Sequence, residues 1–150
     1  MNTKQSDAEI ILKLYELRRD PALRAARAWY AAEFNPLSAA DIAALMVGGF
    51  DSSANYRMVT SYWDMAASLV NNGGIDEKMF LEANTEHMVI FAKLEPFIDE
   101  VREIFGEPDY LIHLQRLVMK TPKAKEVLAR RRNLLGRWTR KGREKAEAAE

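Results

Sequence analysis

Hydrophobic residues recur every three or four positions along most of this 150-residue chain. This spacing places them on one face of an α-helix, whereas a half-buried strand requires strict alternation of apolar and polar residues. A residue that can cap a helix, or a proline, precedes each apolar stripe. The seven helices predicted in this way begin near Ser6, Asp20, Ser38, Asp51, Asp76, Tyr110 and Thr121.

The fifth predicted helix is the longest. Its apolar stripe continues from Phe80 to Phe105, and Pro96 is its only interruption. Proline removes one backbone donor and bends a helix, so we expect a kink at Pro96 and not a break.

No segment alternates β-branched and polar residues over the length of a strand, so the fold class is predicted to be all-α. The turns between successive stripes are short, which favours antiparallel neighbours in a bundle-like array of about seven helices. Near-perpendicular packing would also suit the shorter N-terminal helices. A chain of this length is typical of one domain, and we expect residues 1–150 to form a single helical domain.

Charge is divided unevenly along the chain, although its formal net charge is zero. Residues 1–115 hold 10 basic and 18 acidic side chains, whereas residues 116–145 hold 12 basic and 2 acidic ones. The composition, 48% hydrophobic and 29% charged, is that of a folded globule. We therefore expect an acidic body and a basic C-terminal helix within residues 122–150, frayed at its end.

The chain contains no cysteine, which excludes disulfides, thiolate metal sites and cysteine nucleophiles. Its first residues, MNTKQSDAEI, lack the apolar stretch of a secretory signal. No window approaches the roughly 20 apolar residues that a membrane-spanning helix requires. We expect a cytoplasmic protein without a transmembrane segment.

The sequence offers few residues that could form a catalytic or metal-binding site. A di-metal site in a helical bundle uses Glu-x-x-His pairs, and neither His87 nor His113 has a glutamate three residues before it. The serines lack the G-x-S-x-G context of a hydrolase nucleophile. No metal, cofactor or catalytic residue is predicted, and catalysis is unsupported by the sequence.

Seven basic residues near the C-terminus are the candidate partner-binding residues: Arg130, Arg131, Arg132, Arg137, Arg140, Lys141 and Arg143. Consecutive residues on a helix point about 100° apart, so the triplet 130–132 cannot be buried as a whole. The basic face could lie on the acidic body of the same chain or of a partner chain. It could also contact a nucleic-acid backbone, or an anionic membrane surface with Trp138 at the interface.

The residues from Tyr56 to Leu117 resemble a bacterial family of helical domains of unknown function, some of them tethered to membranes. The matching features are a G-x-I-D turn at residues 73–76 and the spacing P-x-I-x-x-x-R-x-x-x-G-x-P-x-Y from Pro96 to Tyr110. Phe91, Leu94 and Leu114 complete the match. The resemblance implies a helical fold and supplies no function. We expect Arg102 to bridge carboxylates of its helix, while Phe105 and Tyr110 pack across a structural corner at Gly106 and Pro108.

The leading hypothesis is therefore a protein-binding or self-associating helical module without catalysis, which makes contact through its basic C-terminal helix. The alternative is an enzyme or small-ligand binder with a site between helices. That site would be lined by Trp63, His87, Tyr110 and His113. A deep pocket lined by these four residues would favour the alternative, and a filled core would favour the leading hypothesis.

Overall fold

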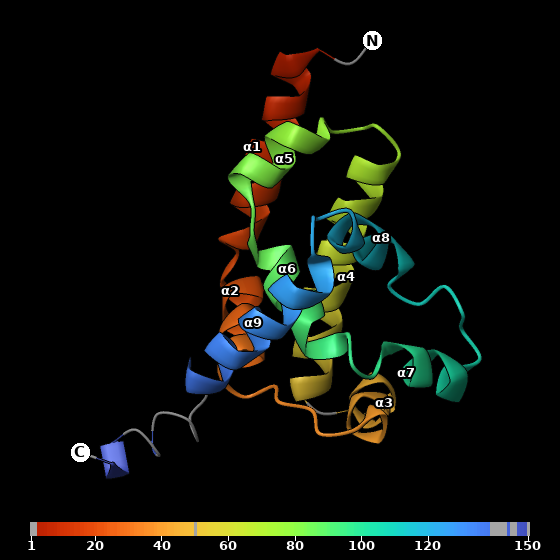
Figure 1. The fold of residues 1–150 in the computed structure, drawn as a ribbon. Helices are drawn as coiled ribbons and strands as arrows, with labels where there is room; N and C mark the ends of the chain where they lie inside the picture. Colours follow the sequence, from red (N-terminus) through yellow and green to blue (C-terminus); the bar gives the residue numbers. More distant parts are fainter. Residues whose placement is uncertain (1–2, 50, 139–143, 145–146, 150) are drawn as a thin grey trace.

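The computed structural model describes residues 3–49, 51–138, 144 and 147–149, and this part of the chain contains α-helices and no strand. The all-α prediction is confirmed. The described residues form nine helices and not about seven: α1 (Lys4–Arg18), α2 (Pro21–Ala32), α3 (Ala39–Val47), α4 (Asp51–Asn71), α5 (Glu77–Ala83), α6 (Glu86–Leu94), α7 (Ile98–Phe105), α8 (Ile112–Met119) and α9 (Ala124–Trp138). Figure 1 shows how they are arranged.

Three of the seven predicted helix starts, those at Asp20, Ser38 and Asp76, are confirmed by side-chain caps. The Asp20 carboxylate accepts hydrogen bonds from the backbone N–H groups of residues 22 and 23, and Ser38 and Asp76 each accept one in the same manner. The helix start predicted near Ser6 is wrong. Thr3 caps α1 by accepting from the N–H of Ser6, so the helix begins before Ser6.

The single Pro-kinked helix predicted between Asp76 and Phe105 is wrong, because this segment forms the three separate helices α5, α6 and α7. The first break lies at Asn84, which has an extended backbone with φ −136° and ψ 134°. Its side chain holds it there, since its amide donates to the Phe80 carbonyl and its oxygen accepts from Arg18 in α1. The second break lies at residues 95–97, where Pro96 ends α6 instead of bending it.

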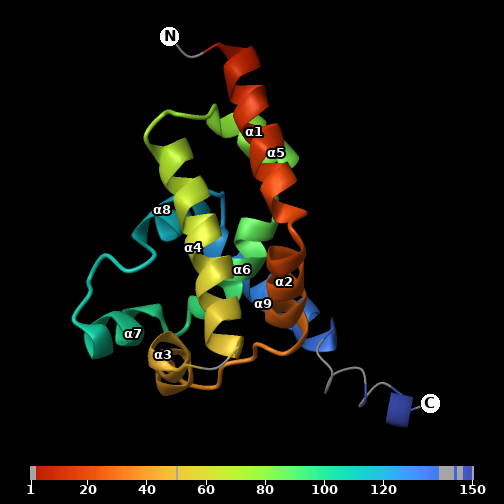
Figure 2. The same cartoon turned by 180° about the vertical axis from the view of Figure 1, so that it is seen from behind.

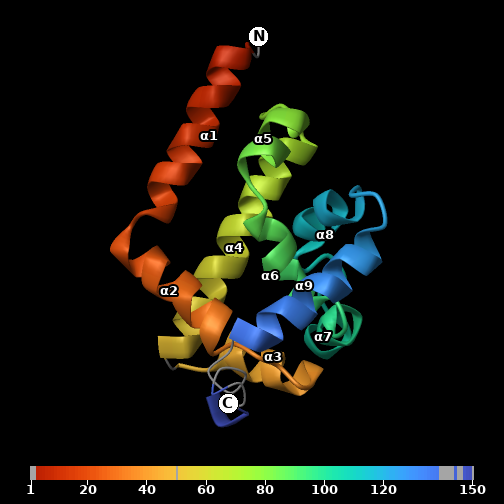
Figure 3. The ribbon, with the colours of Figure 1, turned by 60° about the vertical axis from the view of Figure 1, so that its left-hand side comes forward.

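Helix α4 passes through the middle of the molecule. It packs against α2 on one side and α8 on the other, and α3, α5 and α6 also contact it. Helix α9 lies mainly on α6, and α7 lies on α3. Helix α1 packs on α2 and α5 and projects along the edge of the molecule, as Figure 3 shows. The arrangement is broadly that of a bundle.

The core is filled with large side chains. The predicted stripe of α4 is confirmed, since Tyr56, Val59, Trp63, Ala66 and Val70 are all buried. Buried tyrosine hydroxyls have partners as well, because Tyr30 donates to the Ile90 carbonyl and Tyr62 to the Leu14 carbonyl, both at 2.6 Å. These bonds tie α2 to α6 and α4 to α1.

The connection between α7 and α8 forms the corner that the sequence motif suggests. Gly106 adopts a left-handed conformation, φ 64°, and ends α7. Arg102 Nε donates to the Tyr110 carbonyl at 2.9 Å, and the Phe105 and Tyr110 rings meet edge to face with centroids 6.1 Å apart. The Tyr110 hydroxyl lies 2.7 Å from that of Tyr56, which anchors the corner to α4.

None of the helices in the described ranges combines the length and the apolar character needed to cross a lipid bilayer.

The left-handed backbone at Gly106 generates a testable prediction. A Cβ there would meet no atom within 4 Å, so Gly106→Ala should cost only the backbone strain, about 1–2 kcal/mol of unfolding free energy in urea titrations. Gly136 also has space for a Cβ but lies within α9, so the matched Gly136→Ala variant should be neutral or stabilised by up to about 1 kcal/mol. Equal effects of the two substitutions would contradict this account.

Candidate functional site

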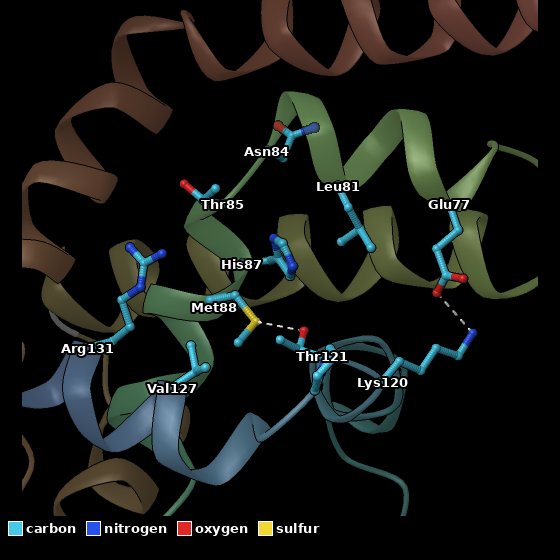
Figure 4. A pocket seen from close by; sticks show the side chains of 11 residues that line it. Glu77, Leu81, Asn84, Thr85, His87, Met88, Lys120, Thr121, Val127 and Arg131 are labelled. Carbon is cyan, nitrogen blue, oxygen red and sulfur yellow. Dashed lines mark hydrogen bonds and ion pairs between the residues drawn. The ribbon is translucent and has the colours of Figure 1, made fainter.

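A hollow of about 350 Å³ lies where α5, α6 and the start of α9 meet the loop after α8. Figure 4 shows His87 among the side chains that surround it, between Leu81 and Met88. The residues that line it are Glu77, Leu81, Asn84, Thr85, His87, Met88, Lys120, Thr121, Pro122, Val127 and Arg131. We call it the His87 hollow.

His87 is the most unusual residue of the hollow, because its side chain is only 2% exposed. Its ring lies beside the rings of Phe80 and Trp63, with centroids 5.7 and 6.3 Å away. Neither ring nitrogen has a hydrogen-bond partner among the described residues. Burial, together with the nearby Arg131 charge, lowers the pKa of His87 to about 4. The ring is therefore neutral at pH 7 and offers one N–H donor and one acceptor.

Some polar groups around His87 lack a hydrogen-bond partner or bond only to sulfur among the described residues. Lys120 Nζ lies 3.3 Å from Glu77 Oε1, and this oxygen makes no hydrogen bond with good geometry. Among the described residues, the side-chain partner of the Thr121 hydroxyl is the sulfur of Met88, at 3.7 Å. Between these groups the walls are apolar. The hollow thus combines a hydrophobic lining with several groups that still have bonding capacity.

The four residues proposed for a ligand pocket are not brought together in one hollow. Trp63 is buried next to His87, whereas Tyr110 lines a separate hollow of about 580 Å³ with Met46 and Asp64. His113 lines a third one, with Asn71, Arg116 and Lys120 among its neighbours. Only His87 and Trp63 of the predicted set are close neighbours.

The arginine triplet is divided among three environments. Arg130 is exposed. Arg131 is half-buried and lines the His87 hollow. Arg132 turns to the end of α6, where it donates to the Ala92 carbonyl at 2.8 Å and pairs with Glu95 at 3.0 Å.

The other predicted partner-binding residues are less fully described. Arg137 lies in α9, and its side chain is not described. Arg140, Lys141 and Arg143 lie outside the described residues.

Sequence reasoning missed Lys93, which is buried although it carries a charge. Its Nζ donates to the backbone carbonyls of Tyr30 (2.6 Å) and Ala31 (3.1 Å) in the last turn of α2, and to that of Phe34 (2.6 Å), which lies two residues beyond the helix. The two carbonyls within α2 are among the acceptors that a helix end leaves unpaired. Burial lowers the pKa of Lys93 to about 8. The signal in the sequence is a lone lysine inside the apolar run of α6.

Sequence reasoning also missed the role of Glu86, whose carboxylate binds two arginines from other helices. Arg27 Nε donates to both of its carboxylate oxygens, at 2.9 and 3.0 Å, and Arg18 approaches it at 3.0 Å. One carboxylate thereby joins α1, α2 and α6. No local sequence pattern announces it, because the three residues are distant in the chain.

Across the described residues, no group of three or more histidine, aspartate or glutamate side chains is arranged to hold a metal ion.

The described part of the chain has an all-α fold, and one known family matches it. The family described as "Domain of unknown function (DUF4760)" matches residues 4–121, and the chain belongs to this family. The match includes α1 to α8 and ends before α9. No curated protein and no solved structure matches the chain.

The pKa of His87 predicts how stability depends on pH. Because it is lowered from 6.5 to about 4, the unfolded chain binds a proton between these values that the folded chain excludes. The free energy of unfolding should therefore fall as the pH drops from 6.5 to 4, by up to about 3 kcal/mol from this residue.

Urea titrations of the native chain and of His87→Phe across that range would measure this component, since the difference between the two curves isolates it. The matched variant His113→Phe should retain the decline. Parallel curves for the native chain and His87→Phe would contradict the assignment.

Proposed function

We propose that this protein is a non-catalytic helical module that associates with a second copy of itself. Its basic C-terminal segment, residues 122–150, contacts the acidic surface of the other copy. In this proposal residues 1–150 act as one helical domain, located in the cytoplasm as the sequence predicts. The filled core favours such a role, because large side chains occupy the interior and the four proposed ligand-pocket residues are not gathered around one hollow.

The basic side of the contact is only partly neutralised within the chain. In the described part of residues 116–138, Lys120 pairs with Glu77 and Arg132 pairs with Glu95. Arg130 is exposed and makes no ion pair with a described residue. Because Arg130 is exposed, its charge is available to a second molecule.

The complementary surface is an acidic ridge on α7 and the corner that follows it. We define the acidic ridge by five exposed residues: Asp99, Glu100, Glu103, Glu107 and Asp109. One of the carboxylates, that of Asp99, lies 3.4 Å from Arg102, while its side chain remains 94% exposed. Helix α7 packs mainly on α3, whereas α9 packs mainly on α6, so the ridge and the basic helix occupy different parts of the molecule.

Charge complementarity between two different surfaces gives a head-to-tail contact, which produces rings or open chains. Each exposed ion pair contributes about 0.2–1 kcal/mol, so several must act together. Salt screens such pairs over about 8 Å at physiological ionic strength. Association should therefore strengthen as the salt concentration falls.

Light scattering and sedimentation of the full chain at low and at physiological salt test the proposal. The native chain should form oligomers at low salt, and Glu100→Lys/Glu103→Lys or Arg130→Glu should each weaken association about tenfold, which corresponds to about 1.4 kcal/mol. A mixture of these two charge-reversed proteins should recover association, because the reversed ridge meets the reversed helix.

The matched control is Glu9→Lys/Glu33→Lys, which changes the charge equally at exposed positions outside the ridge. A native chain that stays monomeric at low salt would overturn the proposal, as would equal weakening by the control. Retention of a monomeric chain on duplex DNA or anionic vesicles would instead support the nucleic-acid or membrane alternative.

A further inference from the structure

We propose that the His87 hollow binds a small organic carboxylate with an apolar body. The hollow shares Pro122, Val127 and Arg131 with the basic C-terminal segment, but these residues line it together with residues of α5 and α6, and its role does not depend on the self-association proposal.

The first argument is the unsatisfied bonding capacity of His87. Buried polar groups are almost always hydrogen-bonded, and leaving one unpaired is unfavourable. Both ring nitrogens of His87 are buried and unpaired among the described residues. The ring lines the hollow, so a molecule bound there lies beside a ring that lacks hydrogen-bond partners.

The second argument is the charge around the hollow. Arg131 and Lys120 contribute two positive charges, and Glu77, which pairs with Lys120, contributes one negative charge. Arg131 forms no ion pair with a described residue. With His87 neutral, the lining carries a net positive charge and favours a monoanion. A guanidinium group binds a carboxylate through two parallel hydrogen bonds, which makes Arg131 the anchor of the anionic group.

The third argument is the lining and size of the hollow. Leu81, Met88, Pro122 and Val127 form apolar walls, which favour an apolar body over a fully hydrated anion such as phosphate. The volume, about 350 Å³, lies at the lower end of the range of roughly 300–1,000 Å³ for small-molecule sites. A short aliphatic or aromatic acid meets both conditions.

Calorimetric titration of the full chain with hexanoate tests the proposal, with 1-hexanol and hexylammonium as probes of equal chain length. Hexanoate should bind saturably, 1-hexanol at least about tenfold more weakly, and hexylammonium not at all, because Arg131 selects the charge. Absence of saturable hexanoate binding would overturn the proposal, and so would equal binding of 1-hexanol.

Variants locate the site. Arg131→Gln should weaken hexanoate binding at least about tenfold, whereas Arg24→Gln removes the same charge from an exposed position on α2 and should leave the affinity unchanged. Val127→Phe should abolish binding by filling the hollow. Circular dichroism of each variant verifies that it is folded.

A measurement on the native chain avoids any dependence on variant folding. In NMR spectra, the methyl protons of bound hexanoate should show contacts to the methyl groups of Val127 and Met88, and the ring signals of His87 should shift. Saturable binding without these contacts would place the ligand elsewhere and overturn the proposal.

Discussion

The packing of α2 and α8 onto the two sides of α4 is the interaction on which the rest of the structure depends. The buried residues of α4 include Tyr56, Trp63 and the fully buried pair Ala66 and Ala67, in which the large rings fill space and the alanines admit neighbours closely. Once α2 and α8 are fixed, the positions of α6 and α9 follow. Helix α6 is tied to α2 through the Tyr30 hydroxyl, and α9 lies on α6.

The parts of the fold that could be predicted from the sequence depend on interactions between residues close together in the chain. The stripe of α4 and the caps at Asp20, Ser38 and Asp76 depend on residues within one or two turns of each other. The break at Asn84 could not be predicted in this way. Neither glycine nor proline marks it, and the extended backbone there depends on an arginine in α1.

The candidate site also combines features that the sequence predicts with features that it does not predict. His87 could be identified as a residue on a buried stripe, and the arginine triplet as a group too charged to be buried together. Their meeting could not be predicted, because Arg131 reaches the His87 hollow only through the packing of α9 on α6. Lys93 is a similar case. Its position in an apolar run is visible, but the carbonyls that it satisfies lie much earlier in the chain.

Arg130 faces solvent, Arg131 lines the His87 hollow and Arg132 binds the end of α6. This arrangement constrains how the C-terminal segment can evolve. Substitutions at these positions can alter one environment at a time. Loss or gain of a single residue between Ala124 and Ala129 would instead rotate all three side chains by about 100°. Each arginine would then point in the direction that the adjacent position has now. The length of this stretch is therefore constrained more tightly than its composition.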